Sequence, residues 1–331
     1  MRYRILLWTM VISLGLGNGV QAATISFDDG GIDSDWATPA NWLGDALPTT
    51  ADFVEILLNH TAEVSLSGAV ASYVDIRDGG TLNVLGGDLT FGHANNRWLW
   101  VGWNSPGTVN QSGGTVLGVG NNADLVVDSF GTYRITGGLL DLADDLIMLD
   151  GATLEVAGNS TVIVRDDLRA TFGSTTNINV ELIGNSAPTI SVSDDLLLQG
   201  NVLLNIDATQ WTGGSDVELF QVAGNIAGNF SSVSVNGQLI PPTAYQVTGS
   251  GVVIPVTEPS TLAMAFAGLI GFAVIRRAHL RAQKKMQNRK TSPPLVFVPE
   301  TPTPKFTKRI QRPFRLAKKR LLGANQDWLD D

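Results

Sequence analysis

The sequence contains no cysteine in 331 residues and only three histidines. A disulfide framework, a cysteine-ligated zinc site and a thiol nucleophile are therefore excluded. The histidines, His60, His93 and His279, show no spacing typical of a metal site or a catalytic triad. Stability must come from apolar burial and backbone pairing, and no catalytic signature points to an enzyme.

Positive charge is scarce in most of the chain. Residues 1–275 hold 7 Lys and Arg against 27 Asp and Glu, whereas residues 276–331 hold 15 against 4. The acidic part precedes an apolar run and the basic part follows it, which is the asymmetry expected when the C-terminus is cytoplasmic. The basic part lacks a nucleic-acid recognition motif, so we expect no nucleic-acid partner.

Long apolar runs occur only near the two ends. The first, Ile5 to Leu16, follows Arg2 and Arg4 and precedes small residues at Val20 and Ala22. This order predicts a signal peptide over residues 1–22, cleaved between Ala22 and Ala23. A retained signal anchor is the alternative.

The second run, Leu262 to Ile275, would be about 21 Å long as a helix, and the basic pair Arg276-Arg277 follows it. We predict a single transmembrane helix that ends at this pair. Residues 278–331 form a basic, proline-containing tail. This tail is either disordered or lies on anionic lipid through residues 312–322.

A short motif links the acidic part to the second run, and its residues are Glu258, Pro259, Ser260, Thr261 and Leu262, with Arg276 and Arg277 at the far end. Residues 257–277 resemble the PEP-CTERM sorting signal of Gram-negative bacteria. The resemblance implies cleavage by exosortase, a membrane protease, and a link to extracellular polysaccharide or biofilm. The same tail occurs on some ice-binding proteins. Cleavage would leave the protein on the cell surface or in the extracellular matrix, and a retained helix would make it a single-pass inner-membrane protein.

The acidic part contains a repeated motif. Residues 80–87, 107–114 and 131–138 read Gly-Thr-x-x-x-x-Gly-Gly, and a weaker copy spans 151–158. Periods of 20 to 28 residues with short, alternating Val/Thr/Ile/Leu runs predict a β-solenoid. We predict an all-β fold, a right-handed parallel β-helix over residues 57–235; a β-sandwich is the alternative. Inward-facing pairs are expected at Leu82/Val84, Leu125/Val127, Leu154/Val156, Val162/Val164 and Leu196/Leu198.

The two ends of this stack need caps because a terminal coil exposes its apolar face. Residues 23–56 carry a Trp…Asn-Trp…Gly…Pro…Asp pattern that resembles the start of autotransporter-like and planctomycete-type β-solenoid proteins. We expect Trp36 and Trp42 to close this end; the alternative is a sugar-binding platform. Closing strands are expected within residues 206–253, with an antiparallel patch, and residues 236–256 form the exit segment.

Aspartate pairs recur once per repeat, at Asp144, Asp145, Asp166, Asp167, Asp194 and Asp195. Such carboxylates are possible Ca²⁺ ligands. The alternative is a solvated acidic row, because the Gly-Gly-x-Gly-x-Asp repeat of calcium-loaded β-rolls is missing. With Arg134, Arg165 and Arg169 nearby, paired carboxylates are also compatible with a polysaccharide-cleaving site, although no signature supports one.

Trp98, Trp100 and Trp103 crowd one short segment. In a strand, Trp98 and Trp100 share one face and Leu99 and Val101 the other. If the aliphatic pair is buried, the two indole rings form an exposed platform for a sugar or a partner.

We therefore predict a non-enzymatic, exported structural or adhesive protein of the surface or matrix. Its expected partners are an exosortase-like protease, membrane lipid and extracellular polysaccharide, with no cofactor unless Ca²⁺ is bound. A carbohydrate-binding or carbohydrate-cleaving β-helix is the alternative. An ice-binding protein is a further one, but Thr108, Thr132 and Thr153 occur as single positions rather than as Thr-x-Thr rows.

Overall fold

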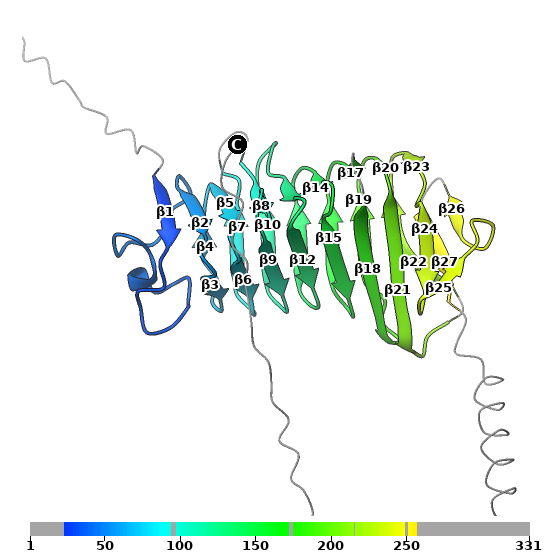
Figure 1. Cartoon of the computed structure of the whole chain (residues 1–331), viewed down its shortest axis with the longest axis horizontal. Helices are drawn as coiled ribbons and strands as arrows, with labels where there is room; N and C mark the ends of the chain where they lie inside the picture. Colours follow the sequence, from blue (N-terminus) through cyan, green and yellow to red (C-terminus); the bar gives the residue numbers. More distant parts are fainter. Residues whose placement is uncertain (1–22, 94–96, 172–174, 215, 249–250, 257–331) are drawn as a thin grey trace, which may run out of the picture. The chain divides into compact units, whose positions relative to one another are not determined.

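The computed structural model describes residues 23–93, 97–171, 175–214, 216–248 and 251–256 (Figure 1). They all belong to one compact unit. The predicted signal peptide, the sorting signal over residues 257–277 with its transmembrane helix, and the basic tail lie outside the described residues. Among the described residues, no helix is long and apolar enough to cross a lipid bilayer.

The chain coils repeatedly through three nine-stranded sheets, which we call sheets A, B and C. Sheet A contains β1 (Thr24–Phe27), β2 (Phe53–Ile56), β5 (Tyr73–Ile76), β8 (Leu99–Val101), β11 (Leu125–Val127), β14 (Leu146–Met148), β17 (Leu168–Thr171), β20 (Leu196–Gln199) and β23 (Ile226–Gly228). Sheet B contains β3 (Thr61–Val64), β6 (Gly80–Val84), β9 (Gly107–Gln111), β12 (Gly131–Ile135), β15 (Thr153–Ala157), β18 (Thr176–Gly184), β21 (Val202–Trp211), β24 (Ser232–Val235) and β25 (Gln238–Ile240). Sheet C contains β4 (Ala69–Val70), β7 (Asp88–Phe91), β10 (Thr115–Gly118), β13 (Leu139–Leu142), β16 (Thr161–Val164), β19 (Thr189–Val192), β22 (Asp216–Val222), β26 (Gln246–Thr248) and β27 (Gly251–Pro255).

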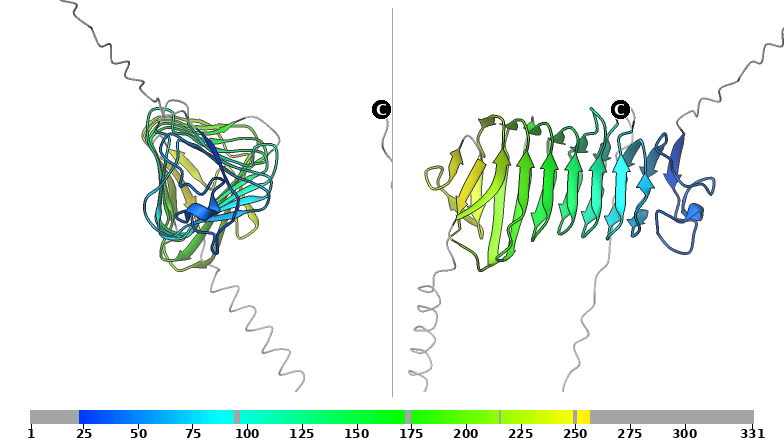
Figure 2. Two further views of the ribbon diagram at one scale, coloured as in Figure 1. Left: turned by 90° about the vertical axis from the view of Figure 1, so that its left-hand side faces the viewer. Right: turned by 180° about the vertical axis from the view of Figure 1, so that it is seen from behind.

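Each coil contributes one strand to each sheet, and every strand pairs in parallel with its counterpart in the next coil until the last coils. Seen along the stack, the described part has a triangular outline with one sheet on each side (Figure 2). The predicted all-β solenoid is therefore confirmed, and the β-sandwich alternative is wrong. The right-handed sense of the coil stays a prediction.

The alternation of side chains explains why these runs stack. All five predicted inward-facing pairs are at most 3% exposed, and they belong to one continuous apolar core. One coil alone cannot bury such a row, but a neighbouring coil covers it. Among the described residues, the members of the core cluster run from Phe27 to Val256.

Glycine begins three consecutive strands of sheet B, and the structure gives the reason. Gly80, Gly107 and Gly131 stack in register, and none of them has a positive φ. A Cβ atom on Gly107 would lie 2.0 Å from the carbonyl oxygen of Ile76, one coil earlier. The glycine that starts each of these repeats is therefore required because the backbone of the preceding coil lies too close for a side chain. Gly114 and Gly138, which end two of the repeats, have a different reason, since both adopt the positive φ expected at a corner.

One polar pair interrupts the apolar interior. Gln111 occupies the inward position that Val84 and Ile135 hold in the adjacent coils. The buried Tyr133 hydroxyl donates a hydrogen bond to Gln111 Oε1 (2.7 Å), and Gln111 Nε2 donates to the Leu139 carbonyl (2.8 Å). These bonds satisfy both buried polar groups, and burial raises the pKa of Tyr133.

Both ends of the stack are covered (Figure 1). At the N-terminal end, near the 3₁₀ turn η1 (Pro39–Asn41), Trp42 packs edge-on against Phe27 and Trp36 at centroid distances of 5.0 and 4.7 Å. Trp36 and Trp42 are at most 4% exposed, so neither ring is available as a sugar platform. At the other end β25, β26 and β27 pair antiparallel with their neighbours.

Candidate ligand-binding surface

Aromatic side chains gather on the outer face of sheet A near the N-terminal coils. Leu99 and Val101 are fully buried in the core, so Trp98 and Trp100 point outward and are partly exposed. The alternation of side chains along this segment therefore places both indole rings on the surface. Their role as a ligand platform stays a proposal.

The preceding coils extend this aromatic row. Phe53 pairs in register with Tyr73, and the register of β5 with β8 places Tyr73 next to Trp98. We call Phe53, Tyr73, Trp98, Trp100 and Trp103 the aromatic surface. The sequence pointed only to the tryptophans. Phe53 and Tyr73 occupy equivalent positions in the two preceding coils, but the coils differ in length, so this equivalence is not visible in the sequence.

Neighbouring groups hold the rings of the aromatic surface in place. Trp98 and Trp100 pack edge to face at 5.1 Å, and Trp100 and Trp103 are tilted at 5.6 Å. Trp100 Nε1 donates a hydrogen bond to Asp128 Oδ2 (3.0 Å). Because the rings stand on a paired sheet and contact one another, they are largely preorganised for binding.

A cleft of about 280 Å³ opens beside these rings, and we call it the aromatic cleft. It is lined by Thr24, Phe53, Glu55, Tyr73, Asp75, Arg77, Arg97, Trp98 and Trp103. Its volume lies near the lower end of ligand pockets, which span roughly 300–1,000 Å³. The cleft therefore combines apolar ring surfaces with a small set of charged groups, as ligand sites commonly do.

The charges of the cleft form two sets. Arg77 pairs through Nε with Asp75 Oδ2 (2.8 Å) and through Nη2 with Glu55 Oε1 (3.1 Å). The Arg97 guanidinium lies 4.3 Å from the centre of the Phe53 ring and makes no ion pair with any described residue. Burial raises the pKa of Asp75 to about 6, although the Arg77 charge opposes this shift.

The same outward row continues from Trp98 into a series of aspartates on the following coils. One carboxylate in each coil accepts a hydrogen bond from the backbone N–H of its counterpart one coil on: Asp145 N to Asp124 (3.2 Å), Asp167 N to Asp145 (3.0 Å), Asp195 N to Asp167 (2.9 Å) and Asn225 N to Asp195 (2.6 Å). The repeated aspartate thus has a structural reason, since it satisfies a backbone donor at each strand start. We call this series the aspartate ladder.

Of the six aspartates predicted as possible Ca²⁺ ligands, Asp145, Asp167 and Asp195 belong to this ladder, and Asp144, Asp166 and Asp194 directly precede them. Carboxylate oxygens come within 4.8 Å of one another in three groups, Asp124/Asp144/Asp145, Asp145/Asp166/Asp167 and Asp167/Asp194/Asp195. Arg169 pairs with both Asp145 and Asp167 at 3.0 Å and supplies positive charge to the middle of the row. Calcium binding stays a prediction, because the ladder also has this purely structural explanation.

The ladder makes stability depend on pH. Burial, followed by the Asp124 charge, raises the pKa of Asp144 to about 7, and burial raises that of Asp145 to about 6. A carboxyl with a raised folded-state pKa binds more protons in the folded than in the unfolded state, here between about pH 4 and pH 7. The folded state is therefore expected to lose stability as the pH rises through this window.

We expect Asp144→Asn to raise the melting temperature at pH 8 and to flatten its decline between pH 5 and pH 8, measured with a chelator present. Asp88→Asn is the control, since a hydrogen bond from Ser67 lowers the pKa of that carboxyl and it does not titrate in this window. An unchanged pH profile in Asp144→Asn would show that the carboxyl does not titrate as the ladder geometry requires.

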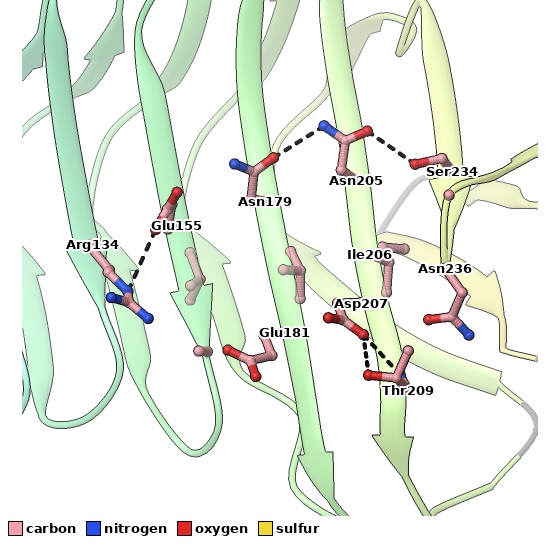
Figure 3. Close-up of a pocket in the computed structure, with 14 residues that line it drawn as sticks. Arg134, Glu155, Asn179, Glu181, Asn205, Ile206, Asp207, Thr209, Ser234 and Asn236 are labelled. Carbon is pink, nitrogen blue, oxygen red and sulfur yellow. Dashed lines mark hydrogen bonds and ion pairs between the residues drawn. The ribbon is translucent and has the colours of Figure 1, made fainter. Parts of the chain in front are cut away.

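A second hollow, of about 570 Å³, lies on the outer face of sheet B (Figure 3). We call it the polar groove. It forms where β18 and β21 lengthen to 9 and 10 residues and the pairing register shifts between Glu181 and Ile183. Asn179, Asn205 and Ser234 join along the groove through two hydrogen bonds of 3.0 Å.

Glu181 and Asp207 face the polar groove from neighbouring strands in register (Figure 3). Hydrogen bonds from the Thr209 side chain and backbone lower the pKa of Asp207, so this carboxyl is not prepared to act as a general acid. The arginines considered for catalysis form ion pairs between coils: Arg134 with Glu155 (3.5 Å), Arg165 with Asp141 (2.7 Å) and Arg169 in the aspartate ladder.

A threonine row also lies on sheet B. Thr61, Thr81, Thr108, Thr132 and Thr153 stack in register, so two further positions join the three noted in the sequence. The neighbouring row contains the charged residues Glu63, Arg134 and Glu155. The row is thus single, as the sequence indicated, and ice binding stays an untested alternative.

A comparison with protein families identifies the segment that follows the solenoid. Residues 255–278 match the family model described as the PEP-CTERM protein-sorting motif. The chain carries a PEP-CTERM motif. This confirms the resemblance of residues 257–277, and the motif implies an exported protein that is sorted through exosortase. No curated protein and no solved structure gives a significant match to the chain.

Proposed function

We propose that this PEP-CTERM protein is displayed at the cell surface or in the matrix, where its solenoid binds polysaccharide without cleaving it. The observation that carries the proposal is the outward orientation of Trp98 and Trp100 beside a cleft on a rigid sheet. Monosaccharide rings present a flat face of C–H groups, and such a face packs well on exposed aromatic rings. A structural or adhesive role at the surface follows from binding of this kind.

The route to the surface is part of the proposal. A signal peptide over residues 1–22 directs export, and the helix over residues 262–275 holds the chain in the inner membrane, in contact with lipid. An exosortase-like protease then cuts near Glu258–Leu262 and releases the solenoid. The motif match supports the sorting step of this route.

A second candidate function is cleavage of the bound polysaccharide. The observation that favours it is the pair Glu181 and Asp207, which face one groove from adjacent strands. Two carboxylates on one face are the usual catalytic groups of glycoside hydrolysis. The lowered pKa of Asp207 argues against its acting as the acid, so we rank binding first.

The sorting step is tested by the intact mass of the protein recovered from the cell surface. We expect an N-terminus at Ala23 and a C-terminus near Glu258-Pro259, with the downstream residues removed. A double variant, Glu258→Ala with Pro259→Ala, is expected to accumulate uncleaved in the inner membrane. Surface protein that still ends at Asp331 would instead mean a retained single-pass anchor.

A further inference from the structure

Two residues that line the aromatic cleft, Asp75 and Arg97, each carry a polar atom without a partner in the described part of the chain. Among the described residues, Asp75 Oδ1 and Arg97 Nε are buried and make no hydrogen bond. The Asp75 side chain is 4% exposed, and its other oxygen is held by Arg77. A third such atom, Ser72 Oγ, does not line the cleft. Unpaired buried polar groups are rare in proteins, so a bound water or a ligand group is expected to satisfy these two atoms.

The two atoms have opposite requirements. Asp75 Oδ1 accepts a hydrogen bond and Arg97 Nε–H donates one. A hydroxyl is the simplest group that offers both a donor and an acceptor, and two neighbouring hydroxyls on one ring can satisfy both atoms at once. The ring that carries them would lie against Tyr73 and Trp98, which line the same cleft.

Charge further restricts the ligand. Arg77 and Arg97 balance Glu55 and Asp75, so the cleft has no net charge. The two arginines already lie over the Trp103 and Phe53 rings, where a cationic ligand would otherwise bind. Residues 1–275 carry 20 more acidic than basic side chains, which repels a polyanion. A neutral ligand therefore fits best.

We propose that the aromatic cleft binds a neutral pyranose unit of a polysaccharide, with neighbouring hydroxyls bridging Asp75 Oδ1 and Arg97 Nε. The inference rests on the proposed glycan binding and adds the class of sugar and the residues that select it. Arg97 and Asp75 determine specificity, whereas the aromatic surface supplies the stacking contact.

The test uses the protein recovered from the cell surface and a matched pair of polymers, polygalacturonate and its carboxyl-reduced neutral form, together with neutral dextran and mannan. We expect saturable binding to at least one neutral polymer and at least about 10-fold weaker binding to polygalacturonate. A preference for polygalacturonate over its neutral form overturns the inference but leaves glycan binding standing. Binding of a proline-rich peptide, with no binding of the host's own polysaccharide or any polymer here, overturns both proposals.

Two variants test whether Arg97 and Asp75 contact the bound sugar. Arg97→Met keeps a long side chain over Phe53 but removes the donor, and it breaks no ion pair among the described residues. We expect affinity for the neutral polymer to fall about 10-fold or more in Arg97→Met and in Asp75→Asn. It should stay unchanged in Arg165→Met, because Arg165 lines neither the aromatic cleft nor the polar groove. Because Asp75→Asn weakens the Arg77 pair, its melting curve is recorded as well, and Arg97→Met decides the matter if that variant unfolds. Unchanged affinity in Arg97→Met would overturn the inference.

Discussion

Gly107→Ala is expected to destabilise the solenoid by about 3 kcal/mol, at the upper end of the usual cost of overpacking. The new Cβ atom would lie 2.0 Å from the Ile76 carbonyl oxygen and 2.8 Å from the Gly102 nitrogen. Both atoms belong to the backbone of stacked coils, so neither can move without disturbing the pairing of β5 and β8 with their neighbours. For a domain of this size, such a loss corresponds to a melting temperature lower by roughly 6–12 °C.

Gly86→Ala is the matched control for this substitution. Gly86 also has an ordinary φ and belongs to an equivalent repeat, but no atom lies within 4 Å of the position that its Cβ would take. We expect this variant to melt within about 1 °C of the parent protein. Equal melting temperatures for the Gly107→Ala and Gly86→Ala proteins would contradict the close stacking of coils at sheet B.

The double variant Trp98→Ala with Trp100→Ala is expected to bind the host polysaccharide about 100-fold more weakly, a loss of about 2.8 kcal/mol. One aromatic hot spot contributes about 2 kcal/mol or more, and the contributions of two rings in contact are not additive. The fold should persist, because Leu99 and Val101, which anchor β8 in the core, are unchanged. The measurement is equilibrium binding, accompanied by a melting curve.

Phe130→Ala controls for the loss of an exposed aromatic ring, because Phe130 is 57% exposed and lies outside the aromatic surface. Its affinity should equal that of the parent protein. Equal affinities for the parent protein and the Trp98/Trp100 double variant would remove the aromatic surface from the binding site.

The solenoid was predictable because its signal is periodic. The Gly-Thr pairs mark the first residues of three strands of sheet B. The apolar residues at every second position, such as Leu82 and Val84, identify the face that points inward. Alternation alone does not say which face of the Trp98 strand is inward. Which face points inward depends on the residues that Leu99 and Val101 contact in the adjacent coils, and only the structure shows these contacts.

The rest of the aromatic cleft was not predictable for a related reason. Phe53, Tyr73, Trp98 and Asp124 occupy one row although they lie 20, 25 and 26 residues apart. Loops of unequal length at the corners hide this equivalence in the sequence. Arg97 gives no local signal either, because its significance comes from the unpaired Nε atom and from the Phe53 ring, which lies two coils earlier.

The interior pair Gln111 and Tyr133 shows a third limit. Polarity alone would place the Gln111 side chain on the surface, but its register with Val84 and Ile135 places it in the core. The Tyr133 hydroxyl and the Leu139 carbonyl, both supplied by the next coil, satisfy its amide and make that burial tolerable.

The central claim is that the surface-displayed solenoid binds polysaccharide and does not cut it. Its most direct test is a binding isotherm of the protein recovered from the cell surface against the host's own extracellular polysaccharide, with released reducing ends and unsaturated products assayed in the same samples. The account predicts saturable binding and no increase in free sugar over hours. Absence of binding, or steady release of sugar, would contradict it.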